Sequence, residues 1–124
     1  MKKLLVICAL FLSSTAYAGG VMKFTEAGFN QLKQDNAAVL IDVHATWCPT
    51  CRKQSKVIKA YFKQYPDSDL TVLKVDFDDQ KHWVKHFKAF RQSTLIMYKG
   101  EKEIGRSIAQ TNEKKLFNLF SLTK

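Results

Sequence analysis

Two cysteines separated by two residues are the feature of this chain that most directly suggests chemistry. Cys48 and Cys51 lie in the stretch "ATWCPTCRKQ", residues 45–54. Such a pair can be half of a metal site, a structural disulfide, or a dithiol that is oxidised and reduced during a reaction. A structural disulfide is the weakest of these, because the stabilisation from a disulfide grows with loop length and this loop is very short.

A metal site at this pair would need ligands from elsewhere in the chain. Closed zinc sites have four ligands, commonly from two such pairs or from one pair and two well-spaced histidines. The chain offers one pair outside its N-terminal segment and three histidines, His44, His82 and His86. His82 and His86 can share one face of a helix, but a solvated helix face accounts for them equally well. The ligand count therefore favours a redox pair, and we expect no metal.

The position of the pair suits dithiol chemistry. Cys48 is predicted at the start of a helix, where free N–H groups and the helix dipole stabilise a thiolate. Pro49 suits the first helical position, because the missing N–H is not needed there. We expect Cys48 to be the exposed, attacking thiolate and the more shielded Cys51 to resolve the mixed disulfide. Trp47 is expected to act as an apolar lid.

Asp42 interrupts the apolar run "AAVLIDVHA", residues 37–45. A carboxylate inside a buried strand is costly unless it is paired or protonated, and burial raises its pKa towards neutrality. A carboxyl tuned in this way can take the proton from Cys51. A solvated aspartate at a strand end is the alternative, but the flanking Ile41 and Val43 place Asp42 within the run.

The elements that must position these residues alternate between strands and helices. Apolar periodicity, with Thr25 as a helix cap and Pro66 as a stop, predicts four helices and four strands. The helices span residues 26–33, 49–65, 79–90 and 112–122, and the strands span 37–45, 70–77, 94–98 and 103–108, the last two joined by a turn at 99–102. This order predicts an α/β fold with a mixed central β-sheet flanked by helices on both faces. The phenylalanines of these segments, Phe90 included, are assigned to the core.

The first 18 residues have the pattern of a signal peptide. Lys2 and Lys3 precede an apolar run at 4–12, and Ala16-Tyr17-Ala18 is a small-x-small cleavage site. We expect cleavage after Ala18, a mature domain at 19–124, a periplasmic or secreted location and no stable membrane insertion. Cys8 would leave with the signal, and Cys48 and Cys51 would function where disulfides persist.

The chain is basic throughout. Its formal net charge is +9 at pH 7, and removing residues 1–18, which hold Lys2 and Lys3 and no acidic residue, leaves +7. Such charge suits acidic protein surfaces, anionic lipids or nucleic acid, but we expect no nucleic-acid partner, because no such motif is present. The length fits one domain, expected to be a monomer. A basic stripe, Arg52, Lys56, Lys59 and Lys63, either guides acidic partners or is only the solvated side of a helix.

In element order and motifs the chain resembles the thioredoxin family over residues 24–122. The matching stretches are "VLIDVHATWCPTC", "TVLKVDFDDQ" and "STLIMYKGEKEIGR". The resemblance implies a thioredoxin-like fold, with Cys48 as nucleophile, Cys51 as resolving cysteine, Asp42 as the buried acid behind them and Lys74 as its buried partner. It also implies protein thiol and disulfide substrates, a redox partner protein, and no cofactor beyond the Cys48–Cys51 disulfide.

Two departures from the family pattern bear on the chemistry of the pair. Pro49 and Thr50 stand between the two cysteines, where the cytosolic reductants of the family carry Gly-Pro and the periplasmic oxidases carry Pro-His. The departure is therefore Thr50, at the second of the two middle positions. Because Thr50 brings no positive charge, the Cys48 thiolate is less stabilised and the disulfide less oxidising. This favours a reductant or an isomerase-like enzyme. His44 stands where the family usually has an aromatic residue.

A third departure is Ser93, at the position of the family's cis-proline. The Gln92–Ser93 bond is either trans with a rearranged loop or cis and strained, and an ordinary trans loop with Ser93 turned to solvent is the alternative. We expect the loop to lie beside Cys48, its backbone to pair with an extended substrate and its hydroxyl to hydrogen-bond a cysteine sulfur. The predicted substrate-binding residues are Trp47, Pro49, Thr50, Ser93 and Thr94.

Two functions from different classes follow. The first is an exported thiol–disulfide oxidoreductase that exchanges dithiol and disulfide with protein substrates through Cys48 and Cys51. The alternative is a thioredoxin-fold module for metal handling or adaptor contacts, without turnover. Stoichiometric uptake of zinc or copper by the reduced protein, with no reduction of a model disulfide, would favour the module.

Overall fold

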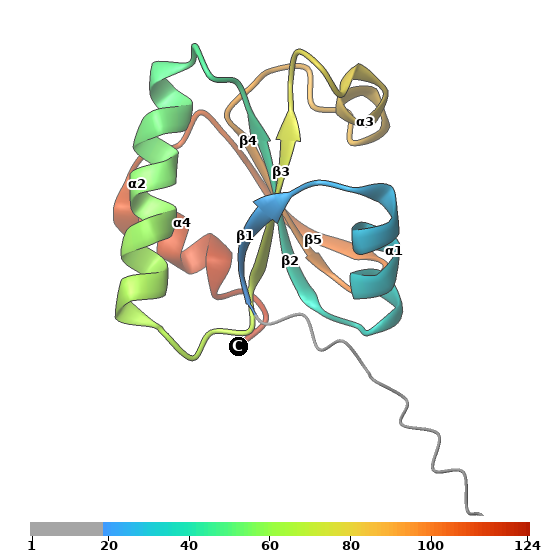
Figure 1. The fold of residues 1–124 in the computed structure, drawn as a ribbon. Helices are drawn as coiled ribbons and strands as arrows, with labels where there is room; N and C mark the ends of the chain where they lie inside the picture. Colours follow the sequence, from blue (N-terminus) through green and yellow to red (C-terminus); the bar gives the residue numbers. More distant parts are fainter. Residues whose placement is uncertain (1–18) are drawn as a thin grey trace, which may run out of the picture.

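The computed structural model describes residues 19–124, and the predicted signal peptide lies outside the described residues (Figure 1). The elements are β1 (Gly20–Lys23), α1 (Glu26–Gln34), β2 (Ala38–His44), α2 (Pro49–Gln64), β3 (Thr71–Asp76), α3 (Lys81–His86), β4 (Thr94–Lys99), β5 (Lys102–Ile108) and α4 (Glu113–Phe120). Every predicted helix and strand is present, and no end is shifted by more than four residues.

The strands form one mixed sheet in the order β1-β3-β2-β4-β5. β1, β3 and β2 run parallel, whereas β4 pairs antiparallel with both β2 and β5. Figure 1 shows α1 and α3 on one face of the sheet and α2 and α4 on the other. The predicted α/β fold is therefore confirmed, and β2, which ends just before the cysteines, lies at the centre of the sheet.

Strand β1 is absent from the sequence prediction. Its four residues pair in parallel with β3, from Gly20 opposite Thr71 to Lys23 opposite Lys74. Its side chains alternate between half-buried and exposed, and four residues are too few for an alternating pattern to stand out from its neighbours. It covers the edge of β3 that would otherwise present unpaired backbone groups.

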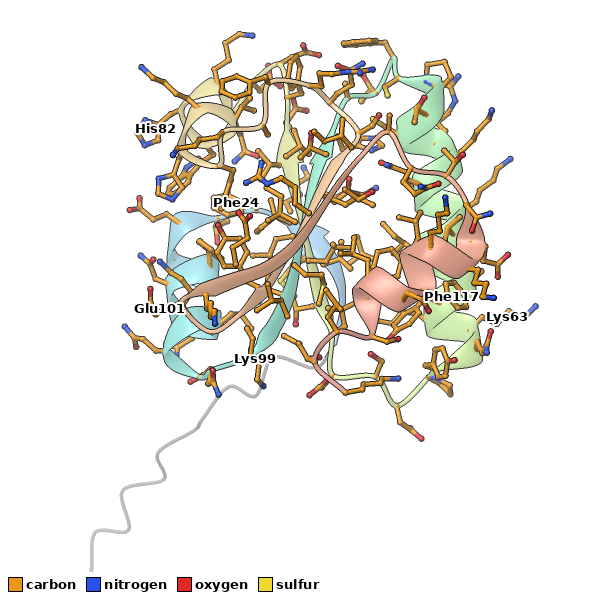
Figure 2. The ribbon with its side chains drawn as sticks, turned by 180° about the vertical axis from the view of Figure 1, so that it is seen from behind. Phe24, Lys63, His82, Lys99, Glu101 and Phe117 are labelled. Carbon is orange, nitrogen blue, oxygen red and sulfur yellow. The ribbon has the colours of Figure 1, made fainter. Side chains whose placement is uncertain are left out.

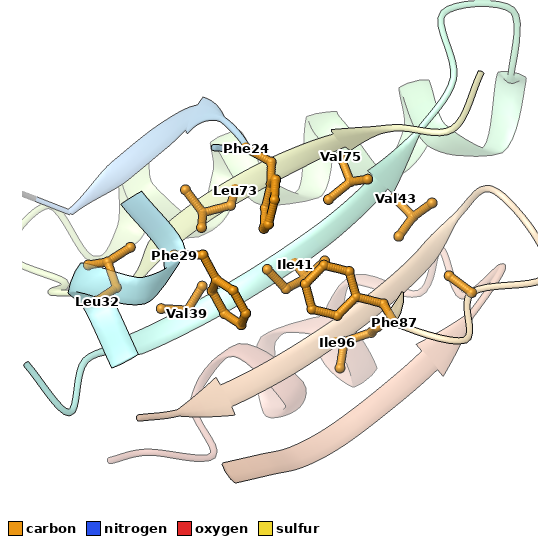
Figure 3. Close-up of a cluster of buried hydrophobic side chains, with 11 residues drawn as sticks. Phe24, Phe29, Leu32, Val39, Ile41, Val43, Leu73, Val75, Phe87 and Ile96 are labelled. Carbon is orange, nitrogen blue, oxygen red and sulfur yellow. The ribbon is translucent and has the colours of Figure 1, made fainter. Parts of the chain in front are cut away.

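The face covered by α1 and α3 is packed with aromatic rings (Figure 3). Phe24 and Phe29 lie 5.6 Å apart between ring centroids, and Phe87 contacts both at 5.6 and 5.4 Å. Thr25 caps α1 as predicted, because its Oγ1 accepts a hydrogen bond from the Gly28 N–H at 3.1 Å. This cluster fixes β2 and β3 from one side.

The opposite face is covered by α2 and α4. Helix α2 buries Cys51, Gln54, Ile58 and Tyr61, which follow one another at helical spacing, and the Tyr61 ring lies 5.3 Å from that of Phe120. Figure 2 shows Lys63 projecting away from α2, and the whole predicted basic stripe is exposed. This packing fixes the rotation of α2 about its axis and turns Cys51 towards the sheet.

Helix α3 is shorter than predicted, and Phe90 does not face the core. The helix ends at His86 with Phe87 as its C-cap, Lys88 takes a left-handed conformation with φ of 52°, and Phe90 is 87% exposed. The Ala89 N–H donates to the Val84 carbonyl at 3.0 Å, which is the closing bond of a Schellman motif. Glycine usually marks such an end, and because lysine occupies this position the sequence pattern extended the helix too far.

Candidate active site

The cysteines lie where β2 gives way to α2. Cys48 is the N-cap of α2, and its Sγ accepts a hydrogen bond from the Cys51 N–H at 3.1 Å. Pro49 occupies the first turn, as predicted. Both cysteines are free thiols, so the structure describes the reduced form. A sulfur in the cap position replaces the usual side-chain oxygen and is placed where a negative charge is favoured.

The expectation that Cys48 forms an exposed tip is wrong for this conformation. Cys48 and Cys51 are each 1% exposed. Ala45 packs with both cysteines, and Phe77 packs against this cluster. The exposed fraction therefore does not distinguish the two residues in this conformation, whereas their ionisation does.

Ser93 contacts both sulfurs. Its Oγ lies 3.1 Å from Cys48 Sγ and 3.2 Å from Cys51 Sγ, and the residue is 2% exposed. The Gln92–Ser93 bond is trans, and Ser93 has φ of 64°. A hydroxyl has one proton, so it donates to one sulfur and can accept from the other. The predicted contact is present, and the alternative with Ser93 turned to solvent is wrong.

Three hydrogen bonds hold Ser93 in this left-handed conformation. Its N–H donates to the Val43 carbonyl at 2.8 Å, and its own carbonyl accepts from the Ala109 N–H at 3.0 Å and from Gln54 Nε2 at 3.1 Å. Such a conformation costs a non-glycine residue about 1–2 kcal/mol. Strands β2 and β5 and helix α2 thus jointly fix the hydroxyl against the sulfurs.

Gln54 is a positioning residue that the sequence analysis missed. It is fully buried, and its Nε2 donates to the carbonyls of Ser93 and Gln110, at 3.1 and 3.0 Å. It therefore ties α2 to the loops before β4 and after β5. The available signal was a glutamine on the apolar face of α2, three residues after Cys51, because a buried amide needs partners.

The same surroundings shift the two thiol pKa values in opposite directions. Burial opposes ionisation of Cys48, but hydrogen bonds from the Cys51 thiol, the Ser93 hydroxyl and the N–H groups of Cys51 and Thr50 outweigh it and lower the pKa of Cys48. Burial, together with the hydrogen bond to Cys48 and the Cys48 charge, raises the pKa of Cys51. Cys48 is thus the thiol that ionises first.

Asp42 is buried behind the pair. It is 1% exposed, and neither carboxylate oxygen has a hydrogen-bond partner within residues 19–124. Burial raises its pKa to about 6, against a smaller lowering by the Lys74 charge. Alternation along β2 puts Asp42 on the same face as Leu40, which packs under α2. A carboxyl with a pKa near neutrality therefore lies beneath the helix that carries Cys51.

Lys74 is half-buried rather than buried. It lies opposite Asp42 in the register of β2 and β3, yet no ion pair joins the two side chains in the part of the chain that is described. His44, at the end of β2, lines a cavity of about 310 Å³ together with Lys74, Asp76 and Gln80. Burial and the Lys74 charge lower the pKa of His44.

The remaining predicted substrate-binding residues differ in accessibility. Trp47 is 56% exposed, and its Nε1 donates to Asp78 Oδ2 at 2.8 Å, so the indole is anchored at the surface. Pro49 is exposed and Thr50 half-buried. Thr94 is 1% exposed, and its hydroxyl donates to the Arg91 carbonyl at 2.6 Å. Its side chain therefore closes the Ser93 loop instead of facing a substrate.

A family model described as "Thioredoxin" matches residues 20–121. The chain belongs to the thioredoxin family. It is 30% identical over 95 residues to thioredoxin from Alicyclobacillus acidocaldarius, covering 77% of this chain and 90% of that protein. It is 34% identical to thioredoxin from Chlamydia trachomatis, over 67% of this chain and 79% of that protein. The protein is therefore a thioredoxin-type thiol–disulfide oxidoreductase whose redox pair is Cys48 and Cys51.

Solved thioredoxin structures share the same fold. The structure of Trxlp from Edwardsiella tarda has a TM-score of 0.77 and 39% identity, covering 82% of this chain and 98% of that one. Oxidised mitochondrial thioredoxin 3 from Saccharomyces cerevisiae has a TM-score of 0.69 and 26% identity, covering 81% of this chain and 92% of that one. These likenesses span nearly the whole described domain.

The first prediction concerns the division of roles between the thiols. Cys48→Ser should abolish disulfide reduction, and Cys51→Ser should accumulate mixed disulfides, because only Cys51 can release the substrate from Cys48. Non-reducing gels of each variant with a disulfide-bonded substrate measure this. Mixed disulfides that build up in Cys48→Ser instead would reverse the assignment.

The second prediction concerns the Ser93 hydroxyl. Ser93→Gly accepts the left-handed conformation and removes the side chain with its hydroxyl, whereas proline can neither take φ of 64° nor donate to Val43. Losing a hydrogen bond to a charged group costs about 1.5 kcal/mol. Because this loss destabilises the Cys48 thiolate of the reduced form, the reduction potential of the Cys48–Cys51 couple in Ser93→Gly should become more negative by up to about 30 mV. Equilibration with glutathione at several pH values measures it, and an unchanged potential would contradict the role.

The third prediction separates positioning from contact. Gln54→Leu keeps the Ser93 hydroxyl but removes both hydrogen bonds from Gln54 Nε2. Its potential should shift in the same direction as that of Ser93→Gly, and the double variant should shift no further than the larger single change. Fully additive shifts would mean that Gln54 acts independently of Ser93.

The fourth prediction concerns Asp42. Its pKa is 3.8 without burial and about 6 in the fold, a shift that corresponds to about 3 kcal/mol in the free energy of unfolding. Because the folded pKa is raised, the folded protein has this contribution to stability in full below pH 3.8, where Asp42 is protonated, and loses it as the pH rises through 6. The stability of Asp42→Asn relative to wild type should therefore increase by up to about 3 kcal/mol from pH 4 to pH 7.5.

Turnover by Asp42→Asn should be slower, because the proton acceptor is gone. Denaturant unfolding and disulfide-reduction rates across pH measure the two effects. The exposed Asp67→Asn is the matched control and should change neither. Unchanged reduction rates across pH in Asp42→Asn would exclude the proton-transfer role.

Proposed function

We propose that the protein is an exported reductant of protein disulfides. The environment of Cys48 supports electron transfer from the protein to its substrate. Hydrogen bonds from neutral groups lower the pKa of Cys48. Neutral donors stabilise a thiolate less than a nearby cation does, and a less stabilised thiolate makes a less oxidising disulfide. The reduced dithiol therefore gives up its electrons readily to a substrate.

In the first step, the Cys48 thiolate attacks one sulfur of a substrate disulfide. A mixed disulfide forms between Cys48 and that sulfur, and the other substrate sulfur leaves as a thiolate. The Ser93 hydroxyl, which donates to Cys48 while the charge is there, is free to turn towards Cys51 once the charge is lost. Trp47, Pro49 and Thr50 border the substrate segment, whereas the backbone groups of Ser93 are already bonded to Val43, Ala109 and Gln54.

In the second step, Cys51 attacks Cys48 and releases the substrate. The raised pKa of Cys51 requires a base, and Asp42 accepts its proton from the face of β2 beneath α2. The protein ends with a Cys48–Cys51 disulfide, and the substrate gains two electrons and two protons. A partner protein that supplies a dithiol then returns the pair to the reduced form by the same exchange in reverse.

Export is supported by residues 1–18, whose lysines, apolar run and Ala16-Tyr17-Ala18 site match a signal peptide. None of the helices described between residues 19 and 124 is long and apolar enough to cross a membrane. Expression of the full chain in a bacterial host, followed by intact-mass measurement, tests this proposal. A periplasmic product beginning at Gly19 would support it, and a cytoplasmic product retaining residues 1–18 would contradict it.

The metal-handling or adaptor module remains the alternative from a different class. Within residues 19–124, no three His, Cys, Asp or Glu side chains come together as a group that could hold a metal ion. Figure 2 shows His82 on the outer side of α3, and the packing of His82 and His86 against Trp83 accounts for their rings.

The reduction potential of the Cys48–Cys51 couple tests the proposed direction. Equilibration with glutathione should give a value nearer to about −270 mV, as in thioredoxin, than to about −120 mV, as in a strong oxidant. The reduced protein should also reduce a disulfide-bonded protein with multiple turnovers when a dithiol is supplied. A potential near −120 mV would contradict the direction. Zinc uptake without turnover would favour the module.

A further inference from the structure

A cleft beside α3 has no role in the chemistry of the pair. Its lining residues are Phe77, Lys81, Val84, Lys85, Ala89 and Phe90, and its volume is about 270 Å³. We call it the Phe90 cleft. Phe77 forms one wall and also packs against the cluster of Ala45, Cys48 and Cys51. The cleft is therefore connected to the redox pair through a single side chain.

Phe90 is presented to solvent by a firmly held turn. It is 87% exposed, whereas its neighbours Phe87 and Ala89 are buried. Arg106 Nη2 donates to the Phe87 carbonyl at 2.8 Å, and Arg106 is itself paired with Glu103 at 2.7 Å. A phenyl ring held in water contributes nothing to the stability of the fold, and such exposed apolar groups often mark interaction sites.

The rim of the cleft is positively charged. Lys81 and Lys85 line it, and Lys88 and Arg91 are exposed on the same turn. No acidic residue occurs between residues 80 and 91. Lys81 Nζ lies 5.8 Å from the centroid of the Phe77 ring, so the charge is adjacent to the apolar wall. The site thus combines an aromatic wall with a cationic border.

We propose that the Phe90 cleft binds an aromatic or large aliphatic side chain of a substrate protein, in a segment that carries Asp or Glu beside that side chain. This rests on the proposed function, since the cleft would recruit the disulfide that Cys48 attacks. Charge complementarity identifies the occupant: acidic residues pair with the rim while the apolar side chain covers Phe90. A second copy of this chain fits poorly, because its net charge of +9 and the same lysine rim would repel.

Reduction of matched peptides tests the proposal. Two peptides with the same cysteine spacing are used, one with Phe flanked by Glu and one with Ser flanked by Gln, beside the small neutral bis(2-hydroxyethyl) disulfide. Wild type should show kcat/KM at least about tenfold higher for the Phe/Glu peptide, equivalent to about 1.4 kcal/mol. Added salt should reduce this preference.

Two variants probe the two parts of the cleft. Phe90→Ser should lower kcat/KM for the Phe/Glu peptide about fivefold or more and leave the small disulfide unchanged. The double variant Lys81→Glu with Lys85→Glu should also lower kcat/KM for the Phe/Glu peptide. It should raise kcat/KM for a peptide that has Lys in place of Glu. The matched controls are Leu122→Ser, which alters an apolar residue that is 50% exposed, and Lys59→Glu with Lys63→Glu on α2. Neither control should change the preference.

The outcomes separate the two levels of the proposal. Failure of wild type to reduce even bis(2-hydroxyethyl) disulfide would contradict the proposed function itself. Normal reduction of that disulfide with no preference between peptides, or equal losses in the controls, would overturn the docking site alone. Sedimentation that shows a dimer abolished by Phe90→Ser, with peptide kinetics unchanged, would assign the cleft to self-association and also overturn the proposal.

Discussion

The contact between one hydroxyl and two sulfurs is the constraint on which this active site depends. To place its Oγ 3.1 and 3.2 Å from the sulfurs, Ser93 takes a left-handed backbone conformation. That conformation is unfavourable for serine, so β2, β5 and Gln54 of α2 must each supply a hydrogen bond to hold it. The central strand, the hairpin and the cysteine-bearing helix therefore all help to hold the Ser93 hydroxyl in place. A change in any of these contacts would alter the distances from that hydroxyl to the sulfurs.

Burial acts on every ionisable group of the site, yet the outcomes differ. It raises the pKa of Asp42 and of Cys51, whereas at Cys48 four hydrogen bonds outweigh it. The balance between burial and the hydrogen bonds that reach each group decides the direction of its pKa shift. The result is a nucleophile that ionises more readily, a resolving thiol that ionises less readily and a buried carboxylate that can receive the proton of that thiol. Thiol–disulfide exchange by this pair thus depends on polar groups that the fold keeps from water.

Sequence reasoning predicted what regular patterns encode. The apolar run around Asp42 and the helical spacing after Cys51 predicted the central strand, the helix and the pair between them, and the resemblance to the thioredoxin family placed the Ser93 loop beside Cys48. Three features escaped because they depend on an atypical helix end or on contacts between segments far apart in the chain. The exposure of Phe90 depends on a helix end without glycine, the burial of Cys48 depends on contacts from distant segments, and the role of Gln54 depends on acceptors in two loops far along the chain.

The central claim is that the Ser93 hydroxyl helps to hold the pKa of Cys48 below its ordinary value. The most direct test follows the ¹³Cβ chemical shifts of labelled Cys48 and Cys51 across pH in the reduced protein and in Ser93→Gly. In wild type, the Cys48 midpoint should lie below the ordinary value of 9.0 and the Cys51 midpoint above it. In Ser93→Gly, the Cys48 midpoint should rise towards 9.0. A Cys48 midpoint that does not move when the hydroxyl is removed, or that lies above the Cys51 midpoint in wild type, would contradict the account.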